Sequence, residues 1–319
     1  MKNLTVNQVI NADFRIGQSN PVLKPWGGSI VVADPSLLTP DISPDGKWHM
    51  FFHTTFGVYS SESNDGISFD KATKIANRAM RPNINFIDGK YYLFYERTRP
   101  LIMNGLNVVN IAKWKSEIFV TESTDLKSWS KPKPVISTAH GYEKSDRGCA
   151  ISNPFLLRED GINRLYYSCG MTFIKDCGFC EPTHICCAES KKITEDYVSL
   201  GKPLISPDKN NPYLNLCSGC LKVYKLADGY IGIQNGIYER DGKSHSAIIL
   251  LTSDDGLSFD FCKVLVEPGG NDWMNQFVYA SHLVKHGNTL RLYFNARDTS
   301  DMLRGRECIG FAQAEINNI

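Results

Sequence analysis

Two Cys-x-x-Cys pairs are the first residues in the chain whose types and spacing suggest a chemical site. They are Cys177 with Cys180 and Cys217 with Cys220. Four thiolates at this kind of spacing are typical of a tetrahedral zinc site. The spacing therefore predicts a metal site at these four residues, with zinc or another thiolate-bound metal as the cofactor. Disulfides, if the protein is exported, and reduced thiols without a ligand are the alternatives.

Arginines offer a second kind of chemistry. The planar guanidinium group suits carboxylate or phosphate, so several of them around one site favour an anionic ligand. A phosphorylated sugar, an acidic sugar or free phosphate would fit. The alternative is a structural network with neighbouring carboxylates such as Glu96. The arginines concerned are Arg81, Arg97, Arg147, Arg240 and Arg297.

Composition and charge exclude some classes of partner. The 319 residues include 35 Lys and Arg and 34 Asp and Glu, which gives a net charge of +1. Nucleic acid is therefore not expected as a partner, because phosphate binding depends on excess positive charge. No apolar run approaches the roughly 20 residues of a membrane span, so no membrane partner is expected. The first residues contain no apolar signal core, which predicts a cytoplasmic protein.

A repeated pattern indicates the elements that must position these residues. Segments such as 59–69, 118–129, 185–190, 249–259 and 309–314 recur about every 60 residues, and a fixed period is the mark of a repeat architecture. Upstream of each lies a turn such as Asp88-Gly89 followed by an aromatic-rich run, which is a hairpin signal. Each unit then reads as four antiparallel strands. We therefore expect an all-β fold with a single five-bladed β-propeller over residues 1–319, whose last blade takes its fourth strand from within residues 4–22. Two β-sandwiches are the alternative.

The propeller geometry predicts a polar pocket on the axis. In an antiparallel blade, strand 1 starts and strand 2 ends on the same face, and these positions are polar here. Polar side chains that converge on one axis are costly unless they are paired or solvated. The pocket residues expected to bind a substrate are Arg81, Asn83, Arg97, Asn153, Asn235, His282 and Arg297.

At this point the sequence resembles the five-bladed propeller glycosidases of glycoside hydrolase family 43 and related families. The resemblance rests on Ala33-Asp34-Pro35, on the Asp-Gly-Lys-Tyr-Tyr-Leu-Phe-Tyr run at 88–95 and on the Ser-x-Asp-Gly-x-Ser-Phe blade ends. It implies that Asp34 is the general base. The family's pKa-tuning aspartate corresponds to Asn153 here. Its general acid, a blade-four glutamate, falls in the run Cys217-Ser218-Gly219-Cys220, which has no carboxylate.

Two other carboxylates are candidates for the missing acid. Glu96 ends strand 2 of blade two, and Asp146 lies in the connection before blade three. Glu96 is equally plausible as a salt-bridge partner of an arginine, because a neighbouring cation favours the charged carboxylate.

These observations lead to one functional hypothesis and two alternatives. The hypothesis is an inverting glycosidase that acts on a carbohydrate, either anionic or phosphorylated, with Asp34 as base and Glu96 or Asp146 as acid. A glycoside phosphorylase with an arginine-rich phosphate subsite is the first alternative. The second is an inactive carbohydrate-binding propeller that contains a Cys-ligated metal, because fold alone does not decide activity.

Overall fold

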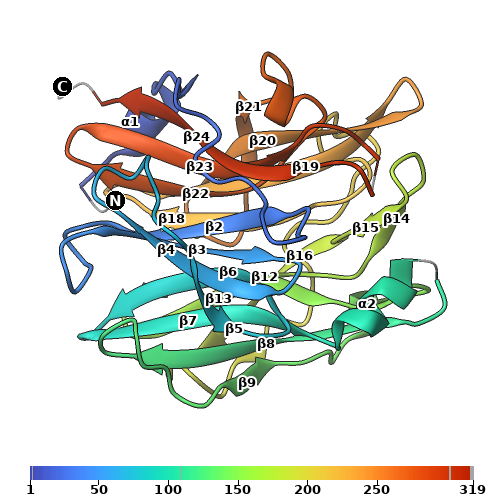
Figure 1. Cartoon of the computed structure of the whole chain (residues 1–319), viewed down its shortest axis with the longest axis horizontal. Helices are drawn as coiled ribbons and strands as arrows, with labels where there is room; N and C mark the ends of the chain where they lie inside the picture. Colours follow the sequence, from blue (N-terminus) through green and yellow to red (C-terminus); the bar gives the residue numbers. More distant parts are fainter. Residues whose placement is uncertain (2, 109, 302, 317–319) are drawn as a thin grey trace.

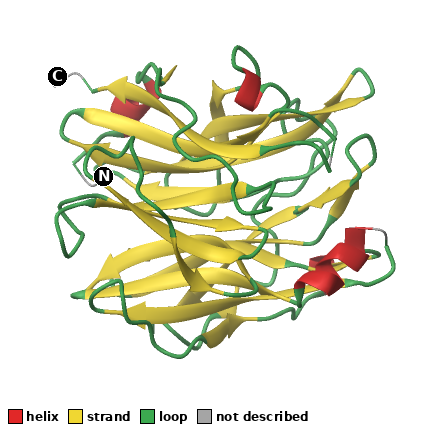
Figure 2. Ribbon diagram, viewed as in Figure 1, coloured by secondary structure: helices red, strands yellow, loops and turns green. Residues whose placement is uncertain are grey.

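The computed structural model describes residues 1, 3–108, 110–301 and 303–316. Strands dominate this part of the chain, and helices are few and short (Figure 2). The strands form five antiparallel sheets of four main strands each, arranged as the blades of a propeller (Figure 1). The five-bladed prediction is therefore confirmed, and the two-sandwich alternative is wrong.

The first three blades follow one another along the chain. Blade one consists of β2 (Val32–Leu38), β3 (Trp48–Thr54), β4 (Gly57–Ser63) and β5 (Thr73–Ala76). Blade two consists of β6 (Ala79–Ile87), β7 (Lys90–Thr98), β8 (Trp114–Ser123) and β9 (Lys133–Ile136). Blade three consists of β12 (Ile151–Glu159), β13 (Ile162–Cys169), β16 (His184–Ser190) and β17 (Val198–Ser199).

The last two blades bring the ends of the chain together. Blade four consists of β18 (Leu221–Lys225), β19 (Tyr230–Arg240), β20 (Lys243–Ser253) and β21 (Asp260–Val266). Blade five consists of β22 (Phe277–His286), β23 (Thr289–Arg297), β24 (Glu307–Glu315) and β1 (Arg15–Ile16). β1 pairs antiparallel with β24 at the edge of the sheet, so the outer strand of blade five comes from the N-terminal segment.

Additional short elements decorate the blades. They are the helices α1 (Val6–Ile10) and α2 (Leu101–Val108), the 3-10 turns Gly141–Glu143 and Asp272–Met274, and the hairpins β10 (Lys144–Ser145) with β11 (Gly148–Cys149) and β14 (Thr172–Ile174) with β15 (Phe179–Glu181). α2 and the β14–β15 hairpin project from the same end of the blade strands (Figure 1). In the described residues, no helix is long and apolar enough to cross a membrane.

The recurring Ser-x-Asp sequence forms the same turn in three of the blades. In blades one, two and four the aspartate follows strand 3, and its carboxylate accepts the backbone N–H groups two and three residues later. These hydrogen bonds lower the pKa of Asp65 and of Asp125 to about 2. Each such carboxylate locks the turn from strand 3 to strand 4.

Aromatic side chains hold neighbouring blades together. The Tyr293 hydroxyl of blade five donates to Gly66 O of blade one at 2.7 Å, and Tyr166 of blade three donates to Gly256 O of blade four at 2.8 Å. Trp48 of blade one is 1% exposed, and its ring centroid lies 6.3 Å from that of Tyr293. The junction between the first and last blades is therefore a packed aromatic contact.

Replacing this tryptophan tests the junction. Trp48→Ala is expected to lower the free energy of unfolding by about 3–5 kcal/mol, because it empties a large site in a packed core. Urea denaturation measures the change. Val198→Ala, at a position 71% exposed, is the control and should cost less than about 0.5 kcal/mol. Equal effects of the two substitutions would contradict the packing described.

Candidate active site

Five equivalent positions, one from each blade, meet in one axial pocket. They are Asp34, Arg81, Asn153, Gly219 and Tyr279, and all five line a cavity of about 610 Å³. In blades one, two, three and five the pairing between strands 1 and 2 slips at this point, so the backbone bulges. A bulge re-aims a side chain. The pocket is thus built largely by one local irregularity that four of the five blades repeat.

The backbone at this position is strained in three of the blades. Asp34, Arg81 and Asn153 have φ values of 55°, 53° and 49°, in the left-handed region that favours glycine. Each such residue costs of order 1–3 kcal/mol. Strain of this kind clusters at functional sites, where surrounding structure maintains it.

Asp34 is a buried carboxylate held in its charged form. Its Oδ2 lies 3.2 Å from His53 Nδ1, and its backbone N–H donates to Asn295 Oδ1 at 3.1 Å. Burial alone would raise the pKa of Asp34, but His53, Arg81 and Lys222 together lower it below 3.8. Asp34 can therefore accept a proton near neutral pH.

Glu181 is the opposite case, a half-buried carboxyl group whose surroundings favour the protonated form. It ends β15 and lines the pocket. Burial, with smaller contributions from Glu307 and Asp34, raises the pKa of Glu181 to about 8, although Arg81 acts against the shift. Among the described residues, the Glu181 carboxyl has no hydrogen-bond or ion-pair partner. It is free to donate its proton to a bound molecule.

The backbone of blade four fixes the position of Glu181. The N–H groups of Ser218 and Gly219 donate to Thr183 O at 3.1 Å and to Pro182 O at 3.2 Å. Gly219 is the blade-four equivalent of Asp34, and a Cβ there would lie 2.3 Å from atoms of Asn235. Blade four thus offers no side chain at this position, and the hairpin from blade three brings Glu181 beside it.

The third carboxylate in the pocket, Glu307, is already engaged. Asn295 Nδ2 donates to Glu307 Oε1, and Arg297 Nη1 lies 3.6 Å from Glu307 Oε2. Burial raises the pKa of Glu307, and Arg297 opposes the shift. Asn295 also accepts a hydrogen bond from the Asp34 backbone N–H. Asn295 and Glu307 therefore connect Asp34 to blade five.

The structure corrects the expectation that Glu96 is the acid. Glu96 is fully buried and does not line the pocket. Its Oε2 accepts from Arg81 Nη1, and its Oε1 accepts from Trp114 Nε1 at 3.2 Å. Glu96 is therefore a salt-bridge partner that fixes two pocket residues, which is the alternative left open from the sequence.

Asp146 also lies away from the pocket. It is exposed, in the turn between β10 and β11, and it borders a separate groove beside β8. The blade connection carries it outward instead of toward the axis. In this structure Asp146 is not among the residues that line the pocket of Asp34.

The expected substrate-binding residues divide into two groups. Arg81, Asn153, Asn235 and Arg297 line the pocket. The other three do not. Asn83 accepts from Leu156 N at 2.9 Å, Arg97 lies over the Phe119 ring, and His282 accepts from Leu37 N at 2.7 Å.

The four cysteines of the Cys-x-x-Cys pairs are not gathered as a ligand set. All ten cysteines are free thiols. Cys177 and Cys217 pack in one apolar cluster, whereas Cys180 lines a side cavity next to the pocket. The structure thus provides no thiolate cage at Cys177, Cys180, Cys217 and Cys220, and metal binding there stays a prediction without structural support.

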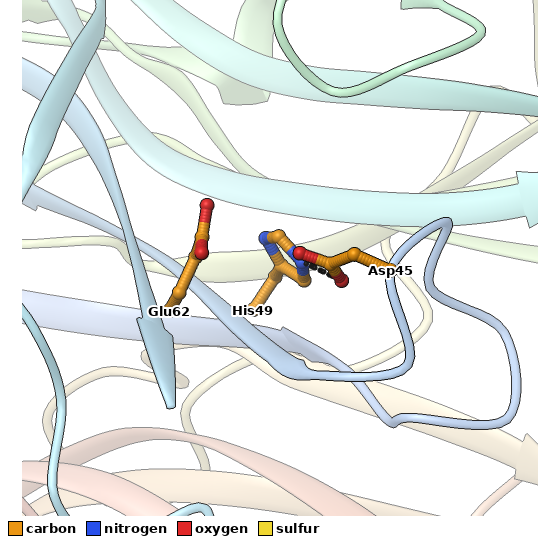
Figure 3. Close-up of side chains that lie close together, drawn as sticks. All are labelled: Asp45, His49 and Glu62. Atoms are coloured by element: carbon orange, nitrogen blue, oxygen red, sulfur yellow. Dashed lines mark hydrogen bonds and ion pairs between the residues drawn. The ribbon is translucent and has the colours of Figure 1, made fainter. Parts of the chain in front are cut away.

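A different group meets the geometric requirement for metal ligands. Across the described ranges, one group of three or more His, Cys, Asp or Glu side chains has its ligand atoms within 4.8 Å of one another, and it consists of Asp45, His49 and Glu62 (Figure 3). His49 Nε2 lies 2.8 Å from Asp45 Oδ1, and Lys47 Nζ lies 2.9 Å from Glu62 Oε2. Existing partners within the protein, the contact between His49 and Asp45 and the pair between Lys47 and Glu62, therefore engage this cluster.

Sequence reasoning did not name several polar pocket residues as site residues, among them His53, Glu181 and Glu307. The strand order of the blades could have placed His53 and Glu307 on the pocket face. His53 lies at the end of strand 2 of blade one, and Glu307 starts strand 3 of blade five. Glu181 lies in the long connection between strands 2 and 3 of blade three, on the face where the pocket was expected. The adjacent Cys-x-x-Cys pair drew the interpretation toward metal instead.

Comparisons with known proteins agree on the fold. No protein-family model matches the chain, and no curated protein sequence matches it either. Among solved structures, an N-acetylgalactosamine deacetylase from F. plautii in complex with blood group B trisaccharide superposes with a TM-score of 0.66 at 14% identity, over 95% of each chain. An α-L-arabinofuranosidase from Podospora anserina in complex with cellotriose gives 0.64 at 14% identity, over 97% of this chain and 98% of that one.

A third structure belongs to the same group of folds. A family 117 glycoside hydrolase from the marine bacterium Zobellia galactanivorans gives a TM-score of 0.61 at 12% identity, over 96% of this chain and 91% of that one. The chain therefore shares its five-bladed propeller with glycoside hydrolases over nearly its whole length. At these identities the likeness establishes the fold, and the chemistry must be argued from the pocket.

Removing the buried charge of Glu96 should destabilise the protein. Glu96→Gln leaves Arg81 without its counter-ion, so we expect a loss of about 3 kcal/mol in the free energy of unfolding, measured in urea. Glu62→Gln breaks the exposed pair with Lys47 and should cost less than about 1 kcal/mol. A cost for Glu96→Gln no larger than that of the control would rule out the buried pair.

The raised pKa of Glu181 should affect stability as a function of pH. Between about pH 4.5 and 8 the unfolded chain ionises this carboxyl while the folded protein keeps it protonated, so wild-type stability falls relative to a variant without the group. Glu181→Gln should therefore match the wild type below pH 4.5, gain on it as the pH rises and level off above about pH 8. Denaturation midpoints at several pH values measure the gap. Parallel curves for the two proteins would contradict the shift.

Proposed function

We propose that the protein is a glycoside hydrolase that cleaves an anionic carbohydrate by an inverting mechanism. One observation carries the proposal: a single pocket of about 610 Å³ holds two carboxyl groups whose environments move their pKa values in opposite directions. Two such groups are the acid and base that glycoside hydrolysis needs.

The two carboxyl groups take different roles. Protonated Glu181 donates its proton to the glycosidic oxygen as the bond to the anomeric carbon breaks. Ionised Asp34 takes a proton from a water molecule, and that water attacks the anomeric carbon from the opposite side. The products are a sugar of inverted configuration and a free hydroxyl on the leaving group. Glu181 then regains a proton from solvent, and Asp34 releases one.

The cationic side chains of the pocket favour a negatively charged substrate. Arg81 and Arg297 both line the cavity, and guanidinium groups pair with carboxylate, sulfate or phosphate. Two of the solved structures with this fold were crystallised with oligosaccharides, which supports a carbohydrate ligand.

Phosphorolysis is the second candidate, and Arg81 favours it. Arg81 lines the same cavity as Asp34 and Glu181, so inorganic phosphate in place of water would lie near a cation there. A screen of 4-nitrophenyl glycosides, uronides included, with and without phosphate separates the two reactions. Sugar 1-phosphate forms only in phosphorolysis.

Substitution of each carboxyl group tests the assigned roles. Asp34→Asn and Glu181→Gln should each lower kcat/KM by roughly 10²–10⁴-fold on a substrate with an alkyl or sugar leaving group. A 4-nitrophenyl leaving group departs without a proton, so Glu181→Gln should recover most of its activity on the aryl substrate. Asp34→Asn should not, since the attacking water still needs a base.

Glu195→Gln is the control for this series, because Glu195 is exposed in the turn between β16 and β17, away from the pocket. It should keep wild-type activity. Full activity of Glu181→Gln on the unactivated substrate would exclude Glu181 as the acid. Equal recovery of both variants on the aryl substrate would show that the two roles are not distinct.

A further inference from the structure

A side cavity adjoins the pocket beside Glu181. It has a volume of about 150 Å³, and it shares Arg81, Trp114, Phe179 and Glu181 with the axial pocket. Asp34 lines only the larger cavity. Glu181 therefore borders both spaces, whereas the base borders one.

This arrangement orders the two halves of a substrate. The base activates the water that attacks the anomeric carbon, so the sugar that is attacked must lie in the larger cavity with Asp34. The acid protonates the oxygen that joins this sugar to its leaving group. The leaving group then extends past Glu181, into the side cavity.

The wall of the side cavity carries a cation. Arg147 lines it, and the guanidinium carbon lies 4.1 Å from the centre of the Phe173 ring. Among the described residues, the guanidinium has no ion pair and donates no hydrogen bond. The backbone of Arg147 is fixed, because its carbonyl accepts from Trp114 N at 2.8 Å and from Asn107 Nδ2 at 3.0 Å. A positioned arginine with all its N–H groups free is suited to an anion.

The surroundings of Arg147 strengthen its positive potential. The groove on the other side of the β10–β11 hairpin is lined by Arg99, Lys113, Lys115 and Lys144, against the two carboxylates Glu117 and Asp146. None of these four cations forms an ion pair with a described residue. Excess charge of one sign near a cleft attracts ligands of the other sign.

We infer that the side cavity is the leaving-group subsite and that Arg147 selects a leaving group with a negative charge, such as a carboxylate, sulfate or phosphate on a single sugar. This inference rests on the proposed function, since the acid Glu181 defines which side the leaving group takes. It adds a specificity-determining residue that lies outside the pocket of Asp34. The predicted product is a small acidic sugar, released through the side cavity.

Equilibrium binding tests the subsite without turnover. The probes are galacturonate, galactose 6-sulfate and galactose 6-phosphate, with neutral galactose and methyl galacturonate as uncharged matches. Calorimetry should detect at least one of the three anions, and Arg147→Gln should weaken its binding about tenfold. Arg147→Lys should restore part of the affinity. Arg158→Gln, on a surface residue paired with Asp88, is the control and should bind as the wild type does.

Cysteine alkylation locates the bound anion. Cys180 lines the side cavity and is half-buried, whereas Cys262 in β21 is half-buried far from it. The bound anion should slow the reaction of Cys180 with iodoacetamide in the wild type and not in Arg147→Gln, and it should leave Cys262 unchanged. Mass spectrometry measures both sites.

Three results would overturn the inference. They are the binding of none of the three anions, equal affinity of Arg147→Gln and the wild type, and binding that leaves Cys180 unprotected. The carboxyl substitutions address the proposed function separately. If Asp34→Asn and Glu181→Gln lose hydrolysis while Arg147→Gln binds the anions as the wild type does, the subsite is refuted and the proposed function stands.

Discussion

The site depends on one backbone constraint, the bulge at the start of the innermost strand. Asp34, Arg81 and Asn153 adopt left-handed conformations there, and the blade geometry turns each side chain toward the common axis. The innermost strands contact their neighbours around the ring, so the strain is held by packing on both sides. Because four of the five blades repeat the bulge, polar groups of different charge can occupy equivalent positions without a change of fold.

Charge balance then sets the protonation of the pocket. Glu96 accepts hydrogen bonds from Arg81 and from Trp114, and so fixes the positions of both side chains. The anchored cation helps to keep Asp34 ionised, whereas Glu181 lacks a partner and burial keeps it protonated. One ion pair at the wall of the pocket, between Arg81 and the buried Glu96, therefore contributes to an acid and a base that coexist in the pocket.

The architecture was predictable from sequence because its signals are local. Turn residues and apolar alternation recur in each blade, the Ser-x-Asp motif recurs in blades one, two and four, and together they indicate the blade number and the polar face. Asp34 followed from the Ala-Asp-Pro motif, and Arg81 and Asn153 followed from their equivalent positions. Glu181 could not be assigned in the same way, because its place depends on how the β14–β15 hairpin folds across to Ser218 and Gly219. The engagement of Glu96 by Arg81 likewise depends on side-chain packing across two strands.

The most direct test of the central claim is the ionisation of Glu181 itself. Carbon NMR of protein labelled at the glutamate carboxyl, with Glu181→Gln to assign the signal, follows this group through a pH titration. We predict a midpoint at about pH 8, so that the carboxyl is protonated at neutral pH and able to act as an acid. A midpoint near the ordinary glutamate value of about 4.3 would contradict the account.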